Sequence, residues 1–127
     1  MATVELTKDN FEKTVNDNPM VIVDFWAPWC GPCRGFAPVF EAAAAKHTDI
    51  VWGKIDTEAQ PELAGSFGIR SIPTLMVFRE KVILFQQAGA LPGQALEQVI
   101  AQAKALDMAK VHAEVEGQKQ AQPQDQK

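Results

Sequence analysis

The segment Met20–Trp26, MVIVDFW, is the feature that most constrains the fold. Its residues are apolar with almost no interruption, a pattern typical of a strand buried on both faces of a sheet. Such strands occur in α/β proteins, where helices cover both faces of the sheet. The one charge in the segment is Asp24. A buried carboxylate is costly unless it has a partner or a function, so either Asp24 reaches solvent at one face or it serves the chemistry of the protein.

The rest of the chain alternates between strand-like and helix-like patterns. Strand patterns cover residues 3–6, 50–55, 74–78 and 82–87, and helical patterns follow near residue 9, after Pro32, from Glu58 to Phe67 and from Pro92. Asp9 and Glu12 have the spacing of a capping box at the first of these helices. Together the elements predict an α/β fold with a mixed central β-sheet sandwiched by about four helices.

Length and charge limit the class of protein. A chain of 127 residues fits one domain with a core of its own. We predict a domain over residues 1–107, followed over 108–127 by a helical extension and a disordered, glutamine-rich tail. The net charge of −4 offers no broad basic face to nucleic acid or to an anionic membrane. The first ten residues lack the pattern of a secretory signal. We therefore expect a cytoplasmic monomer.

The only two cysteines, Cys30 and Cys33, stand two residues apart in the stretch APWCGPCR. A structural zinc site needs four Cys or His ligands, and His47 and His112 match no ligand spacing. A disulfide across two residues removes little entropy from the unfolded chain, so it is a poor staple. We therefore favour a reversible redox couple over two incidental buried thiols, and we expect no metal.

The position of the cysteines favours an order of attack. They lie between the buried strand and the next helix, so Cys30 is expected at the helix N-terminus and Cys33 one turn inside. Unpaired backbone N–H groups and the helix dipole stabilise a thiolate at that end, and the thiolate is the reactive form. We expect Cys30 to be the more exposed sulfur and the nucleophile, and Cys33 to resolve the mixed disulfide.

Several separate segments give the chain a resemblance to the thioredoxin family. Val23–Cys33 is similar to the active-site segment of that family, and Ala37-Pro38, Gly68–Thr74 and Ala88–Ala90 match its other characteristic segments at the expected spacings. The match spans about residues 3–106. Thr57–Ala59 and Arg70–Pro73 further resemble the second bacterial thioredoxin type. That type carries an N-terminal zinc region with more cysteine pairs, which this sequence lacks.

The resemblance implies roles for residues outside the cysteine motif. The matching aspartate of the family, here Asp24, passes a proton to and from the resolving thiol, and the matching lysine, here Lys54, modulates that aspartate. The resemblance also implies a cis peptide bond before Pro73, which from sequence alone would be improbable. Substrate contacts are expected on a flat, mostly uncharged rim of Trp29, Gly31, Pro32, Ile72, Pro73, Gly89 and Ala90.

The resemblance thus implies a protein-disulfide reductase of the cytoplasm. It implies no bound cofactor, electrons from NADPH through the flavoprotein thioredoxin reductase, and disulfide-containing proteins as substrates. Two alternatives remain from the sequence: a disulfide oxidase or isomerase with the same fold, and a binding or chaperone module that does not depend on its thiols. The hairpin Arg79–Lys81 departs from the family because it lacks the usual glycine, so a residue with a side chain must accept a positive φ or the turn must differ.

Overall fold

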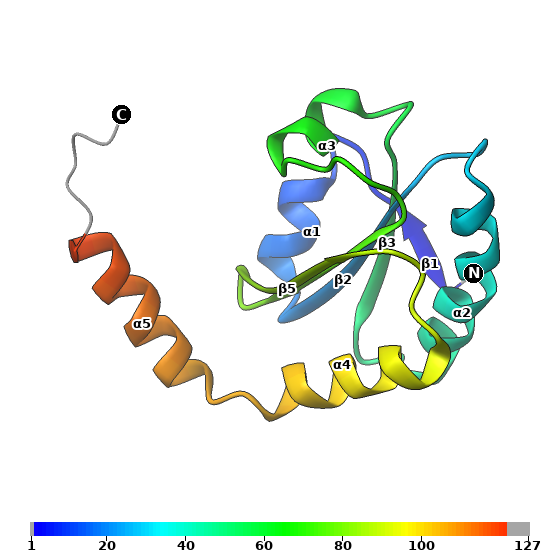
Figure 1. The fold of residues 1–127 in the computed structure, drawn as a ribbon. Helices are drawn as coiled ribbons and strands as arrows, with labels where there is room; N and C mark the ends of the chain where they lie inside the picture. Colours follow the sequence, from blue (N-terminus) through cyan, green and yellow to red (C-terminus); the bar gives the residue numbers. More distant parts are fainter. Residues whose placement is uncertain (1, 122–127) are drawn as a thin grey trace.

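The computed structural model describes residues 2–121, and the side chains of residues 2–118. One mixed sheet forms the centre of the fold, with strands in the order β1-β3-β2-β4-β5 (Figure 1). The strands are β1 (Thr3–Glu5), β2 (Met20–Trp26), β3 (Val51–Asp56), β4 (Thr74–Arg79) and β5 (Val82–Ala88). The helices are α1 (Phe11–Asp17), α2 (Gly31–Lys46), α3 (Pro61–Ser66), α4 (Gly93–Ala105) and α5 (Met108–Ala121).

Strand β2 is the central strand, as its apolar sequence predicts. It pairs in parallel with β3 and antiparallel with β4. All of its residues from Met20 to Phe25 are buried. In this register Asp24 lies opposite Lys54 on one side and opposite Leu75 on the other. The strand therefore carries its one charge into the middle of the sheet.

Two apolar cores lie on the two faces of the sheet. On one face α2 and α4 pack over alternate strand residues such as Ile22, Trp52 and Leu75. On the other face α1 and α3 cover Val23, Phe25 and their neighbours. Because side chains alternate along a strand, Asp24 shares the face of Ile22 and points toward the side that α2 covers. The predicted sandwich is confirmed, with α5 as a fifth helix beyond it.

The start of α1 differs from the predicted capping box. Its N-cap is Asn10, which makes no side-chain capping hydrogen bond. Asn10 Oδ1 instead accepts from the backbone N–H of Thr7 at 2.7 Å. The preceding turn therefore uses the amide of the N-cap residue, and the spacing of Asp9 and Glu12 does not mark a capping box.

The hairpin between β4 and β5 keeps a two-residue turn without glycine. Glu80 and Lys81 both have positive φ, 51° and 72°. The Glu80 N–H donates to the Pro19 carbonyl at 2.7 Å, which fixes the turn against the start of β2. The sequence left two possibilities open, a positive φ at a residue with a side chain or a different turn. The first is the one observed, at Glu80 and Lys81.

The C-terminal part of the chain forms a separate helix rather than a frayed continuation of α4. Arg79 Nη1, at the end of β4, donates to the carbonyls of Ala103 (2.9 Å), Lys104 (3.2 Å) and Leu106 (3.0 Å). These bonds end α4, and Asp107 then caps α5 by accepting from two backbone N–H groups.

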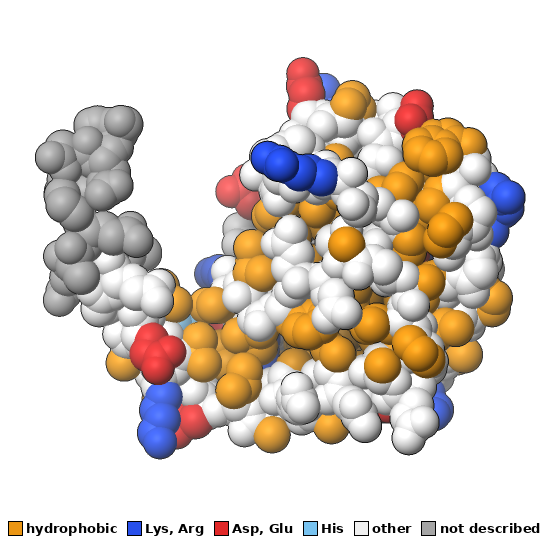
Figure 2. All heavy atoms as spheres, viewed as in Figure 1, with side chains coloured by type: hydrophobic (Ala, Val, Ile, Leu, Met, Phe, Trp, Pro, Cys, Tyr) orange, Lys and Arg blue, Asp and Glu red, His pale blue; other side chains and the backbone are white. Residues whose placement is uncertain are grey.

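Among the described side chains, those in the first turns of helix α5 contact the domain. Met108 is buried, and His112 Nε2 lies 2.7 Å from Glu80 Oε1 in the hairpin. Beyond that point α5 projects from the body (Figures 1 and 2). It extends to Ala121, so part of the predicted glutamine-rich tail is helical, and residues 122–127 lie outside the described residues. None of the helices within residues 2–121 is long and apolar enough to span a bilayer.

Candidate active site

Cys30 and Cys33 form a disulfide at the N-terminus of α2. Cys30 is the N-cap residue, and its Sγ accepts a hydrogen bond from the Cys33 backbone N–H at 3.2 Å. Gly31 and Pro32 occupy the first two helical positions, where a proline N–H is not needed. The loop after β2 therefore places one sulfur at the positive end of the helix dipole, where a thiolate is stabilised.

Exposure does not distinguish the two sulfurs in this disulfide form. Cys30 is 3% exposed and Cys33 2% exposed, whereas the sequence led us to expect a more exposed Cys30. Both pack with Ala27 against Trp26 and Ile72. Position on the helix, and not exposure, therefore separates the two cysteines in this form.

Asp24 is fully buried, and neither of its carboxylate oxygens has a hydrogen-bond partner within the described residues. Burial raises its pKa to about 7, and the negative charge of Glu41 on α2 acts in the same direction, while the positive charge of Lys54 opposes the rise. A carboxyl with this pKa is both protonated and ionised near neutral pH. It can therefore accept and return a proton.

Lys54 lies beside Asp24 in the sheet register, but its amino group is engaged elsewhere. Its Nζ sits 4.8 Å from the centre of the Trp26 ring, a cation–π contact. No ion pair among residues 2–118 joins it to Asp24. Lys54 thus acts on Asp24 through its electric field.

The Ile72–Pro73 peptide bond is cis and faces the cysteines. The Ile72 carbonyl oxygen lies 3.8 Å from Cys30 Sγ. Gly89 donates its N–H to the Pro73 carbonyl at 2.8 Å, which joins the end of β5 to this segment. Residues far apart in the sequence are therefore brought to one edge of the site.

The residues predicted for the rim differ in exposure. Pro73 is buried and Ile72 half-buried, and the exposed members are Trp29, Gly31, Pro32, Gly89 and Ala90. Trp29 is 64% exposed. Most charged side chains in the view of Figure 2 lie toward the margins of the molecule.

Two side chains that the sequence did not single out hold the cysteine loop. Glu58, after β3, accepts from Trp29 Nε1 at 3.0 Å. Arg34, on α2, donates to the Pro28 carbonyl at 3.0 Å. The Trp29–Glu58 contact has no local sequence signal, because the two residues are 29 positions apart and belong to different loops.

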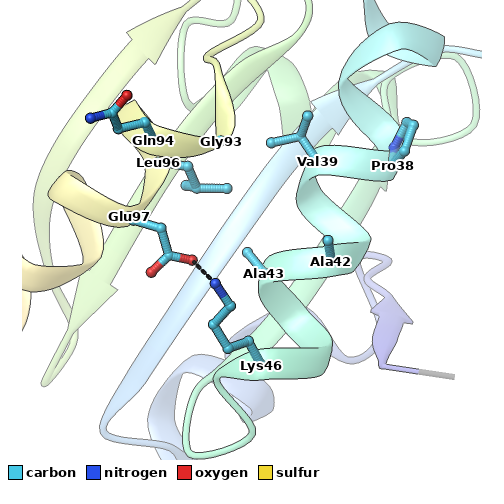
Figure 3. Close-up of a pocket in the computed structure, with 9 residues that line it drawn as sticks. All are labelled: Pro38, Val39, Ala42, Ala43, Lys46, Gly93, Gln94, Leu96 and Glu97. Carbon is cyan, nitrogen blue, oxygen red and sulfur yellow. Dashed lines mark ion pairs between the residues drawn. The ribbon is translucent and has the colours of Figure 1, made fainter.

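A groove of about 490 Å³ lies away from the cysteines, between α2 and α4 (Figure 3). Its walls are apolar, and the ion pair Lys46–Glu97, at 3.5 Å, crosses one end. None of the predicted site residues lines it. In the part of the chain that the structure describes, no group of three or more His, Cys, Asp or Glu side chains could hold a metal ion.

A disulfide-bonded cysteine pair at a helix N-terminus, with a cis-proline segment against one of its sulfurs, defines a thiol–disulfide oxidoreductase. The thioredoxin family model matches residues 2–102. A Streptomyces coelicolor protein named "Putative thioredoxin 2" is 61% identical over 114 residues, covering 90% of this chain and 85% of its own. The thioredoxin of Alicyclobacillus acidocaldarius is 43% identical over 101 residues, covering 79% and 96%.

Solved thioredoxins share the fold. The thioredoxin of Plasmodium falciparum superposes with a TM-score of 0.73 at 32% identity, over 79% of this chain and 97% of that one. A mutant thioredoxin from Halobacterium salinarum gives 0.76 at 30% identity, over 84% and 95%. The chain belongs to the thioredoxin family and is a protein-disulfide reductase.

Proposed function

We propose that this protein reduces disulfides in cytoplasmic proteins and is itself re-reduced by an NADPH-dependent thioredoxin reductase. The observation that carries the proposal is the Cys30–Cys33 disulfide at the start of α2, on the sheet face that also holds the unpartnered Asp24. The cysteines themselves carry the two electrons, so no bound cofactor is required.

The reaction has two steps. The Cys30 thiolate attacks one sulfur of the substrate disulfide, forms a mixed disulfide and releases the first substrate thiolate. Cys33 then loses its proton to the Asp24 carboxylate and attacks Cys30 Sγ. The second substrate sulfur leaves as a thiolate, and the Cys30–Cys33 disulfide remains. Lys54 moderates the affinity of Asp24 for the proton through its charge.

The substrate segment lies across the rim beside Cys30. Trp29, Gly31 and Pro32 border the cysteines on one side, and Ile72, Pro73, Gly89 and Ala90 on the other. The Ile72 backbone, next to the Cys30 sulfur, offers pairing to an extended peptide of any sequence. Such backbone contacts suit a reductase with many protein substrates.

Trapping of the mixed disulfide tests the order of attack. We expect Cys33→Ser to accumulate a covalent complex with a disulfide substrate and Cys30→Ser to form none, with turnover lost in both. Mass spectrometry of the quenched reaction gives the readout. The reverse pattern would show that Cys33 is the nucleophile.

The direction of electron flow is tested by the redox potential. We expect equilibration with glutathione to give a value near or below the cytosolic poise, about −220 to −320 mV, and NADPH consumption when a bacterial thioredoxin reductase and insulin are added. A potential well above that range would assign the protein to oxidation or isomerisation instead.

A further inference from the structure

A small pocket of about 290 Å³ adjoins the cis-proline segment on the side of the edge strand β5. It lies between the loop that follows α3 and the end of β5. The residues that line it include Ile69, Arg70, Ser71, Thr74, Gln86 and Ala88. Ser71 and Thr74 flank the Ile72–Pro73 bond in the sequence, so the pocket begins where the predicted substrate rim ends.

Three side chains around this pocket are hydrogen-bond donors available to a ligand. Arg70 is the only ionisable residue in its lining. Arg70, Ser71 and Gln86 are exposed, and within residues 2–118 no hydrogen bond or ion pair engages their side chains. Thr74 Oγ1 donates to the Ser71 carbonyl at 2.6 Å and so fixes the turn. A guanidinium with neighbouring donors, in a pocket whose described lining holds no Asp or Glu, suits a carboxylate.

The two exposed charged side chains that hold the cysteine loop are already engaged. Glu58 is bonded to Trp29, and Arg34 to the Pro28 carbonyl. Arg70, two residues before Ile72, has by contrast no side-chain partner within the described residues and is free to meet a ligand. An extended peptide advances about 3.3 Å per residue. When the target cysteine of a substrate peptide lies beside Ile72, the side chain two residues away in that peptide lies about 7 Å from the cysteine. That distance is within the span of an arginine side chain.

We propose that this pocket binds the carboxylate of an Asp or Glu two residues from the target cysteine, so that the protein favours disulfides with acidic flanks. The inference deepens the proposed function and rests on it. Arg70 supplies the charge, Ser71 and Gln86 supply further donors, and the backbone contacts at Ile72 set the register.

The test compares peptides that share one intramolecular disulfide and differ only in having Glu, Gln or Lys two residues before or after the target cysteine. Pre-reduced protein is mixed with each peptide in a stopped-flow instrument, and a single turnover is followed by tryptophan fluorescence. We expect the Glu peptide to react about three- to fivefold faster than the Lys peptide at low salt in one of the two placements. The difference should shrink as salt is added.

Arg70→Gln should abolish the preference, and Arg70→Lys should keep part of it, because lysine retains the charge but not the bidentate geometry. Lys104→Gln is the matched control: it removes the same charge from α4, where Lys104 pairs with Asp49 at 2.9 Å, and should leave the preference intact. Equal rates for all peptides, or a preference that survives Arg70→Gln, would overturn the inference. If the parent protein fails to reduce even the Gln peptide, the proposed function itself fails, which is a different result.

Discussion

The two ends of the β2–β4 strand pair each carry a charged side chain, and the two differ in how well their polar groups are hydrogen-bonded. Asp24 in β2 is fully buried and its carboxylate has no hydrogen-bond partner within the described residues. Arg79 in β4 lies at the other end of the same strand pair, opposite Met20, and its guanidinium reaches three backbone carbonyls. An unpartnered buried acid weakens the fold, whereas a well-paired arginine stabilises it. The strand end that leads to the cysteines therefore carries a destabilising acid, and the far end carries a stabilising arginine.

The sharpest test of this comparison is the pH dependence of stability. The pKa of Asp24 is raised to about 7 in the folded protein from 3.8, so between these values the folded state holds a proton that the unfolded state has released. The free energy of unfolding should fall as pH rises through this window, by up to about 1.4 kcal/mol per pH unit. Asp24→Asn should remove that slope.

Urea unfolding of the disulfide form between pH 4 and 8 gives the measurement. The difference in the free energy of unfolding, Asp24→Asn minus parent, should be more favourable to the variant at pH 8 than at pH 4, by on the order of 3 kcal/mol. Asp17→Asn, at an exposed surface carboxylate, is the control and should leave the slope unchanged. Parallel pH curves for the parent and Asp24→Asn would show that Asp24 does not cause the pH dependence of stability.

The far end is tested by Arg79→Ala. Loss of the guanidinium leaves the carbonyls that end α4 without their donor, and we expect a loss of about 2 kcal/mol in the free energy of unfolding. The loss should not change with pH between 5 and 8. Arg79→Lys should recover only part of it, because one amino group cannot reproduce the geometry. A variant as stable as the parent would show that α4 ends without this arginine.

The smallest effect is expected in the hairpin. Lys81 has φ 72°, a conformation that costs an ordinary residue about 1 kcal/mol and glycine nothing. Lys81→Gly should therefore stabilise the protein by about 0.5 kcal/mol after the entropy of glycine is counted. Lys81→Ala, as its control, should give no gain. Differential scanning calorimetry of the three proteins measures the order, and a destabilised glycine variant would contradict it.

The predictability of the two ends also differs. The strand Met20–Trp26 was predictable to the residue, because an unbroken apolar run between turn signals has few alternatives. The place of the cysteines, after this strand and at the start of a helix, was predictable too. The break between α4 and α5 was not, because it depends on Arg79, whose acceptors lie 24 to 27 residues away. Local patterns do not record such contacts.

The site shows the same limit. The resemblance indicated the position of Lys54, but not that its amino group rests on Trp26. The expectation of a more exposed Cys30 came from helix geometry alone, and the packing of both sulfurs against Ile72 and Trp26 changed it. The hydrogen bond between Trp29 and Glu58 joins two loops, and no periodic sequence pattern predicts it.

Cys30 is both the N-cap of α2 and the residue whose sulfur exchanges electrons. A disulfide sulfur is a weak acceptor for the Cys33 N–H, whereas a thiolate is a charged and stronger one. The hydrogen bond that caps α2 is therefore stronger in the reduced protein than in the disulfide form. The exchange rate of the Cys33 amide proton therefore reports the redox state of Cys30. The proton should exchange with solvent more slowly in the reduced protein. It should exchange faster when Cys30 is covalently joined to another chain.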